Sequence, residues 1–108
     1  MIFTGNAAEL ATLTLKHLGS EWWPGIEFGK YGWHRDLIAL DLRDAASIIF
    51  AAAWVWLAVR GYASQLFPPT EWKPRFSVKV HIHERNSVLI LEGPSPLHAV
   101  LAAVEACK

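Results

Sequence analysis

The chain has 108 residues, 53% of them hydrophobic, and its ten acidic side chains balance its ten basic ones. This length is typical of one globular domain that needs no disulfide or metal to fold, so we expect a single domain over residues 1–108. The charge balance excludes the basic stripe of a nucleic-acid-binding protein and gives no electrostatic attraction to acidic membranes.

The first predicted element is a helix from Ala7 to about Leu18. Asn6 can cap its start, with Glu9 completing a capping box three residues later. Gly19 can end the helix in the left-handed conformation.

Residues 20–35 follow, and glycine and proline interrupt them too often for a helix. A short strand at Ile26–Phe28 fits there. Aromatic side chains recur along the segment and argue against disorder, and such side chains dominate protein interfaces. We therefore predict a partner-binding loop, with a loop that fills a second small core as the open alternative. The predicted partner-binding residues are Trp22, Trp23, Phe28, Lys30, Tyr31, Trp33 and Arg35.

Two elements are predicted next. Leu37–Leu40 favours a short buried strand. A central helix follows, capped by Asp41 or Asp44, and it ends near Leu66 before a pair of prolines, or earlier at Gly61.

The middle of this helix, Ala45–Val59, contains no charged residue, and Ser47 is its one polar residue. A helix that is apolar on every side must be covered on most of them, so we expect it to be the hub of the core. The run is shorter than the roughly 20 apolar residues of a membrane span, so we expect no membrane association.

Residues 75–83 alternate between apolar and polar side chains, which predicts a strand, and residues 88–92 form the return strand of a hairpin. A turn centred between Arg85 and Asn86 puts Lys79 opposite Glu92, a favourable charge pair. The other predicted pairs are Val80 with Leu91, Ile82 with Leu89, His81 with Ile90 and His83 with Val88. No helix is left to cover the second face of the hairpin, so we predict a homodimer through it. The predicted dimer face consists of His81, His83, Val88 and Ile90.

Ser95 caps the last predicted helix, and Pro96 takes its first position. The order of elements is therefore α-β-α-β-β-α. Because a strand–helix–strand unit favours a right-handed parallel crossover, we expect an α+β domain. Its three-stranded mixed sheet, one strand plus the C-terminal hairpin, packs with three helices.

The second half of the chain, from Asp44 to Ala106, resembles small phage-encoded α/β sandwich domains of unknown function. The resemblance rests on the Ala51–Trp54 stretch, on the hairpin opened by Trp72 and Phe76–Val78, and on Pro94–Val100. It implies a phage protein and names no activity. The hairpin and the alanine-rich helix also resemble a double-stranded-RNA-binding domain, but that family's lysine cluster is absent before the last helix, so we expect no RNA binding.

Histidines supply the other candidate chemistry. His81 and His83 lie two residues apart on one strand face and can offer two imidazoles to a metal ion, with His98 or His34 as a third ligand. This ligand set is incomplete, so we expect no metal. His34 with Asp36 or Asp41 is a candidate acid–base pair. No nucleophile or phosphate-binding loop is recognisable, so we expect no enzyme and no cofactor.

The leading hypothesis is a small non-enzymatic protein of phage or mobile-element type that binds a host protein, with inhibition by steric occlusion as its mode of action. One alternative is a metal-binding protein or enzyme that uses His81 and His83. The other is a structural homodimer subunit. The single cysteine, Cys107, excludes an internal disulfide and fits a reducing compartment, so we expect the cytoplasm.

Overall fold

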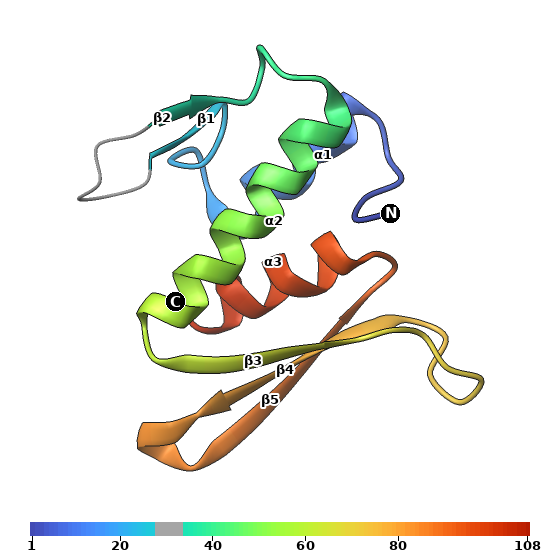
Figure 1. Ribbon diagram of the computed structural model, residues 1–108, viewed down its shortest axis with the longest axis vertical. Helices are drawn as coiled ribbons and strands as arrows, with labels where there is room; N and C mark the ends of the chain where they lie inside the picture. The colour runs from blue at the N-terminus through green and yellow to red at the C-terminus, as the bar shows by residue number, and fades with distance from the viewer. Residues whose placement is uncertain (28–33) are drawn as a thin grey trace.

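The computed structural model describes residues 1–27 and 34–108. The described residues form three helices and two small sheets. In Figure 1 the helices lie above the larger sheet, and the smaller hairpin lies at the far end of the helices. The expected α+β class is confirmed. In chain order the elements are α1 (Ala7–Leu18), β1 (Gly25–Glu27), β2 (His34–Asp36), α2 (Leu42–Val59), β3 (Tyr62–Phe67), β4 (Phe76–Ile82), the 3-10 turn η2 (His83–Arg85), β5 (Ser87–Gly93) and α3 (Pro96–Ala106).

The sheet arrangement differs from the prediction. The described residues form a two-stranded antiparallel sheet, β1–β2, and a separate three-stranded sheet in the order β3–β4–β5. Every strand pair in the larger sheet is antiparallel, so the predicted mixed sheet and its parallel crossover are wrong. The larger sheet is a simple up-and-down meander that follows α2 directly.

The predicted strand at Leu37–Leu40 is a turn between β2 and α2. The Asp36 carboxylate accepts a hydrogen bond from the Ile38 N–H at 3.0 Å, which bends the chain here. Leu37 is buried, 1% exposed, because the turn tucks it into the core rather than because it belongs to a strand. The third strand is instead β3, which comes from residues predicted to end the central helix. Gly61, with φ of 81°, breaks the chain out of α2 because glycine adopts this left-handed conformation without strain.

The β4–β5 hairpin forms as predicted but in a register shifted by two residues. Val80 lies opposite Leu89, and Lys79 lies opposite Ile90 rather than Glu92. The shift arises because η2 and Asn86, with φ of 47°, form a turn one residue earlier than predicted. A shift of two residues keeps every side chain on its predicted face.

Helix α3, not α2, is the hub of the core. It contacts α1, α2, β4 and β5. Its buried residues are Pro96, Leu97, Ala99, Val100, Leu101, Ala103 and Val104. They pack together with Val78 and Val80 of β4 and with the inner side of α2.

Three predicted caps are confirmed. Asn6 accepts from the Glu9 N–H at 2.9 Å, and Asp41 accepts from the Asp44 N–H at 2.9 Å. Ser95 accepts from the His98 N–H at 3.2 Å at the start of α3. Each satisfies one of the N–H groups that a helix start leaves without an intrahelical partner.

The expectation that the central helix is covered on most sides holds in part: Ile48, Phe50, Trp54 and Trp56 are half-buried against the core, whereas the strip Ala51, Val55, Ala58 and Val59 is exposed. One side of α2 is buried, through Ala45, Ala46, Ile49, Ala52, Ala53 and Leu57. Among the described helices α2 alone has the length and apolar composition of a membrane span, and 33% of it is buried within the chain. Core helices of globular proteins can have the same length and apolar composition. The unusual feature of α2 is therefore its exposed apolar side.

Candidate binding surfaces

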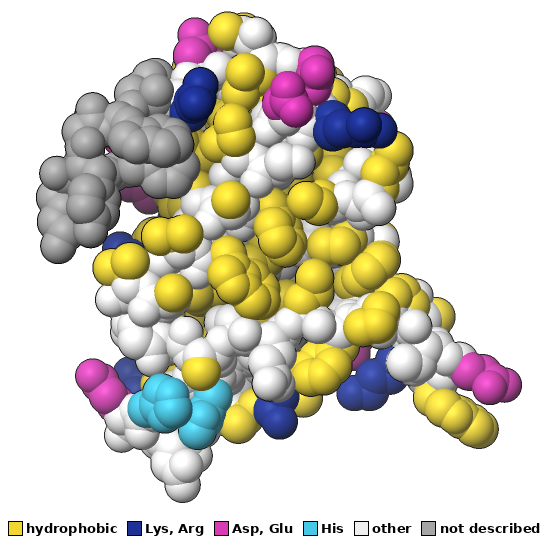
Figure 2. Space-filling model, viewed as in Figure 1, with side chains coloured by type: hydrophobic (Ala, Val, Ile, Leu, Met, Phe, Trp, Pro, Cys, Tyr) yellow, Lys and Arg dark blue, Asp and Glu magenta, His cyan; other side chains and the backbone are white. Residues whose placement is uncertain are grey.

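The uncovered side of α2 is an apolar surface that we call the α2 surface. Its residues are Phe50, Ala51, Trp54, Val55, Ala58 and Val59. They recur at intervals of three and four, so they lie along one side of the helix. Figure 2 shows hydrophobic side chains gathered over α2 in the middle of this face of the molecule.

Exposure and ring packing define the character of the α2 surface. Val55 is 51% exposed and Val59 is 74% exposed. The half-buried rings of Phe50 and Trp54 form the edge of the surface: they pack against the core on one side and stack on each other, with their centroids 6.0 Å apart and their planes at 16°. At the end of the helix the Arg60 guanidinium lies 3.7 Å from the centre of the Trp56 ring, which holds both side chains in place.

The residues of the predicted partner-binding loop differ in their environment. Trp22 and Trp23 are half-buried and pack against the core of the domain. Arg35 lies exposed in β2, opposite Ile26 of β1. The other four residues of that prediction, Phe28, Lys30, Tyr31 and Trp33, lie outside the described residues.

The predicted dimer residues lie on or beside the outer face of the larger sheet. In the described part of the chain, all three helices lie on the opposite side of this sheet (Figure 1). Strand pairing places nine side chains on the outer sheet face: Ala63, Gln65 and Phe67 of β3, Ser77, Lys79 and His81 of β4, and Val88, Ile90 and Glu92 of β5. Val88 is 46% exposed and Ile90 is 54% exposed, so this face also offers apolar area to a partner.

The structure brings His81 and His83 together and keeps the other described imidazole side chains away from them. The ring centroids of His81 and His83 are 4.5 Å apart, with an angle of 54° between the planes. His17 instead pairs with the Glu105 carboxylate, which ties α1 to α3. The Nδ1 atom of His98 lies 2.6 Å from the Ser95 hydroxyl. No group of three or more metal-ligating side chains exists among the described residues, and the His34 side chain lies outside them.

Within the described part of the chain, two titratable groups, His98 and Cys107, have shifted pKa values. Burial lowers the pKa of His98 below its ordinary value of 6.5, and the nearby positive charges of His17 and Arg75 act in the same direction. Burial raises the pKa of the Cys107 thiol above its ordinary value of 9.0. A protonated thiol is a poorer nucleophile than a thiolate.

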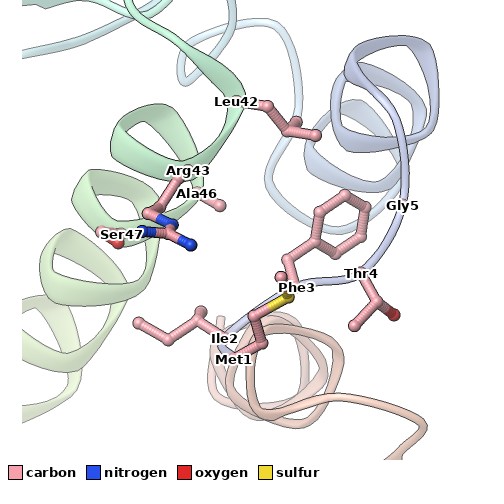
Figure 3. Close-up of a pocket in the computed structure, with 9 residues that line it drawn as sticks. All are labelled: Met1, Ile2, Phe3, Thr4, Gly5, Leu42, Arg43, Ala46 and Ser47. Atoms are coloured by element: carbon pink, nitrogen blue, oxygen red, sulfur yellow. The ribbon is translucent and has the colours of Figure 1, made fainter.

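A pocket that the sequence did not predict lies between the N-terminal segment and the start of α2. It has a volume of about 620 Å³. Figure 3 shows Met1, Ile2 and Phe3 on one side and the first turns of α2 on the other. The lining residues are Met1, Ile2, Phe3, Thr4, Gly5, Leu42, Arg43, Ala46 and Ser47. Only one of them, Arg43, is charged, so this pocket offers apolar space without an acid–base pair.

Comparison with known proteins gives no relative: no family model matches the chain, and neither a curated protein nor a solved structure is similar to it. Any functional conclusion therefore depends on the surfaces described above.

Proposed function

We propose that the chain is a non-enzymatic binding protein that recognises a protein partner through the α2 surface. The observation that carries the proposal is the exposed apolar side of α2, with Val55 and Val59 more than half exposed. Isolated exposed apolar residues are ordinary, but a continuous stripe along one helix marks an interaction site. The opposite side of the same helix is held in the core, so the surface is presented on a rigid element.

The α2 surface has the composition of a protein interface. Phe50 and Trp54 supply two large aromatic groups already stacked on each other, and tryptophan is enriched among residues that dominate binding energy. Because the two rings are packed before binding, they lose little conformational freedom when a partner covers them. Valines and alanines complete the surface and suit the apolar groove or helix of a partner.

Charge favours a protein over a lipid surface as the occupant. Helices that lie on membranes carry a polar side rich in lysine and arginine. The ends of α2 instead carry both signs, with Arg43 and Asp44 at the start and Arg60 after the last turn. These mixed charges at the ends of α2 give no preference for acidic lipids.

The test compares matched lysine substitutions on two surfaces. Val55→Lys and Val59→Lys place a charge on the α2 surface, whereas Val88→Lys changes a residue of similar exposure on the outer sheet face. Tagged forms of the wild-type chain and the three variants are used to capture proteins from a lysate of the source organism, and thermal melting of each variant is measured in parallel.

The proposal requires a protein that the wild type and Val88→Lys capture and that both α2 variants lose, with all melting temperatures unchanged. The affinity of that purified protein should fall by roughly 2 kcal/mol or more on either α2 substitution. Equal capture by all four forms would contradict the proposal. Binding of the wild type to neutral lipid vesicles that is lost in Val55→Lys would assign the surface to a membrane instead.

A second candidate function is self-association through the outer sheet face. The observation that favours it is the position of Val88 and Ile90 on a sheet face that no described helix covers. We also propose, as in the hypothesis from the sequence, that the partner at the α2 surface is a host protein and that binding inhibits it.

A further inference from the structure

His81 and His83 differ from the other histidines whose side chains are described. His17 is engaged by Glu105, and His98 is engaged by Ser95. Within the described residues, neither the His81 ring nor the His83 ring has a hydrogen-bond or ion-pair partner. Their ring nitrogens are therefore available to a ligand, and the two rings lie side by side with centroids 4.5 Å apart.

The backbone explains why the two rings are so close. On a flat strand, positions two apart are separated by about 6.6 Å. Here β4 ends at Ile82 and His83 begins the 3-10 turn, where its carbonyl accepts a hydrogen bond from the Asn86 N–H at 3.2 Å. The chain thus curls at His83 and brings its ring towards that of His81. His81 itself lies between Ala63 and Val88 on the neighbouring strands and is half-buried.

We propose that His81 and His83 together bind a divalent transition-metal ion of the class that prefers imidazole, namely Cu²⁺, Ni²⁺ or Zn²⁺. Two imidazole nitrogens at 2.0–2.1 Å from a tetrahedral ion are about 3.3 Å from each other. Ring nitrogens lie at the perimeter of rings whose centres are 4.5 Å apart, so small side-chain rotations reach this separation. Water completes the coordination, because the site is open to solvent.

This site is separate from the α2 surface, although it lies on the sheet face that is the second candidate surface. The histidine pair is on the outer sheet face, whereas the α2 surface is on the helical side of the molecule. Because the described residues supply no third clustered ligand, binding depends on both imidazoles acting as a chelate. Removal of either ring leaves a single imidazole, so the affinity should fall by roughly tenfold or more.

The test is calorimetric titration of the full chain, free of any polyhistidine tag, with NiCl₂. The wild type should bind Ni²⁺, and His81→Ala and His83→Ala should each lose the greater part of that affinity. His17→Ala removes a histidine elsewhere, and Cys107→Ser removes the thiol, so both should keep wild-type affinity. His83→Gln provides a milder variant at the exposed turn, and it should lose affinity to the same extent as His83→Ala.

A second readout follows from linkage between binding and stability. Excess Ni²⁺ should raise the melting temperature of the wild type and of His17→Ala, but not that of His81→Ala or His83→Ala. The proposal is overturned if the wild type shows no binding in a large excess of Ni²⁺. It is also overturned if the His81 and His83 variants bind as the wild type does, or if His17→Ala or Cys107→Ser weakens binding equally.

Discussion

Gly93 at the end of β5 lies directly against His98 in the first turn of α3. A Cβ atom on residue 93 would be 2.5 Å from the His98 Cβ and 2.9 Å from the Ala99 backbone nitrogen. Both neighbours belong to the helix rather than to a flexible side-chain end. The absence of a side chain at Gly93 therefore allows the end of β5 to pack closely against the first turn of α3.

We predict that Gly93→Ala destabilises the protein by about 1–3 kcal/mol, because the helix must shift to make room for the added methyl group. Urea unfolding of the wild type and the variant measures the free energy of unfolding. Ala102→Gly, a change within α3 that creates no clash, should cost about 1 kcal/mol through helix propensity alone, and it gives a scale for the effect at residue 93. A Gly93→Ala variant as stable as the wild type would contradict the close packing of β5 on α3.

A second prediction concerns acid stability. Burial lowers the pKa of His98 in the folded protein below 6.5, with help from the charges of His17 and Arg75. The folded state then binds fewer protons than the unfolded state as the pH falls below about 6.5. The stabilisation linked to His98 is fully present above that pH and is lost as the pH falls through the folded-state pKa.

The measurement compares urea unfolding of the wild type and His98→Asn at pH 8 and at pH 5. The wild type should lose more stability between the two pH values than the variant, because asparagine does not titrate. The other histidines are common to both proteins, so their direct contributions cancel in the difference. An equal loss in both proteins would mean that the imidazole of His98 is as easily protonated in the folded chain as in the unfolded one.

A third prediction uses two neighbouring positions on α2. Leu57 is fully buried, 0% exposed, and Val55 is 51% exposed. Leu57→Ala should cost about 2–5 kcal/mol because it leaves a cavity in the core. Val55→Ala should change the free energy of unfolding by less than about 0.5 kcal/mol, as surface substitutions do. Thermal and urea unfolding of both variants check the orientation of the helix, and similar losses in the two would contradict it.

The orientation of α2 could not be predicted from the sequence for a physical reason. A helix with a polar stripe reveals its buried side, but Ala45–Val59 is apolar all round and carries no such signal. The side that becomes buried depends on where α3 and β3 pack, which is a long-range property. The α2 surface was therefore missed.

Features that depend on neighbouring residues, such as helix caps, were predicted correctly, whereas the pairing of strands distant in the sequence was not. The caps at Asn6 and Ser95 were predicted because a capping side chain and its N–H partner are three residues apart. The strand Tyr62–Phe67 was missed because these residues directly continue the apolar helix and their strand partner, β4, begins nine residues later. The spacing of His81 and His83 in the sequence indicated that they share one strand face. The short distance between their rings depends on the curl of the chain at η2, which the hairpin turn sets.

A fourth prediction distinguishes two aspartates at the start of α2. Asp41 accepts a hydrogen bond from the Asp44 N–H, so Asp41 is the cap. Asp41→Ala should cost about 1 kcal/mol, as the loss of a capping side chain does. Asp44→Ala removes only a favourable charge near the helix start, so it should cost about 0.3–1 kcal/mol at low ionic strength and less in high salt. Urea unfolding at two salt concentrations separates these contributions, and a cost for Asp41→Ala that disappears in salt would contradict the capping role.

The last prediction is that the chain self-associates through the outer sheet face. Ile90 is 54% exposed on β5, opposite Lys79 on the central strand, and the described helices all lie on the other side of the sheet. Ile90→Lys would place a second positive charge beside Lys79 and remove apolar area from the contact. If two copies pair through this face, the substitution should weaken the dimer by roughly 2 kcal/mol or more, the loss typical of a central interface residue.

Sedimentation equilibrium over a range of concentrations gives the dimerisation constant of the wild type, Ile90→Lys and the control Val55→Lys. The wild type and Val55→Lys should dimerise equally, and Ile90→Lys should shift towards the monomer with its melting temperature at low concentration unchanged. Dimerisation lost in Val55→Lys but kept in Ile90→Lys would place the contact between copies on α2. A wild type that stays monomeric at every concentration would remove self-association from the functions of this sheet, because its apolar residues would then have no second copy to cover them.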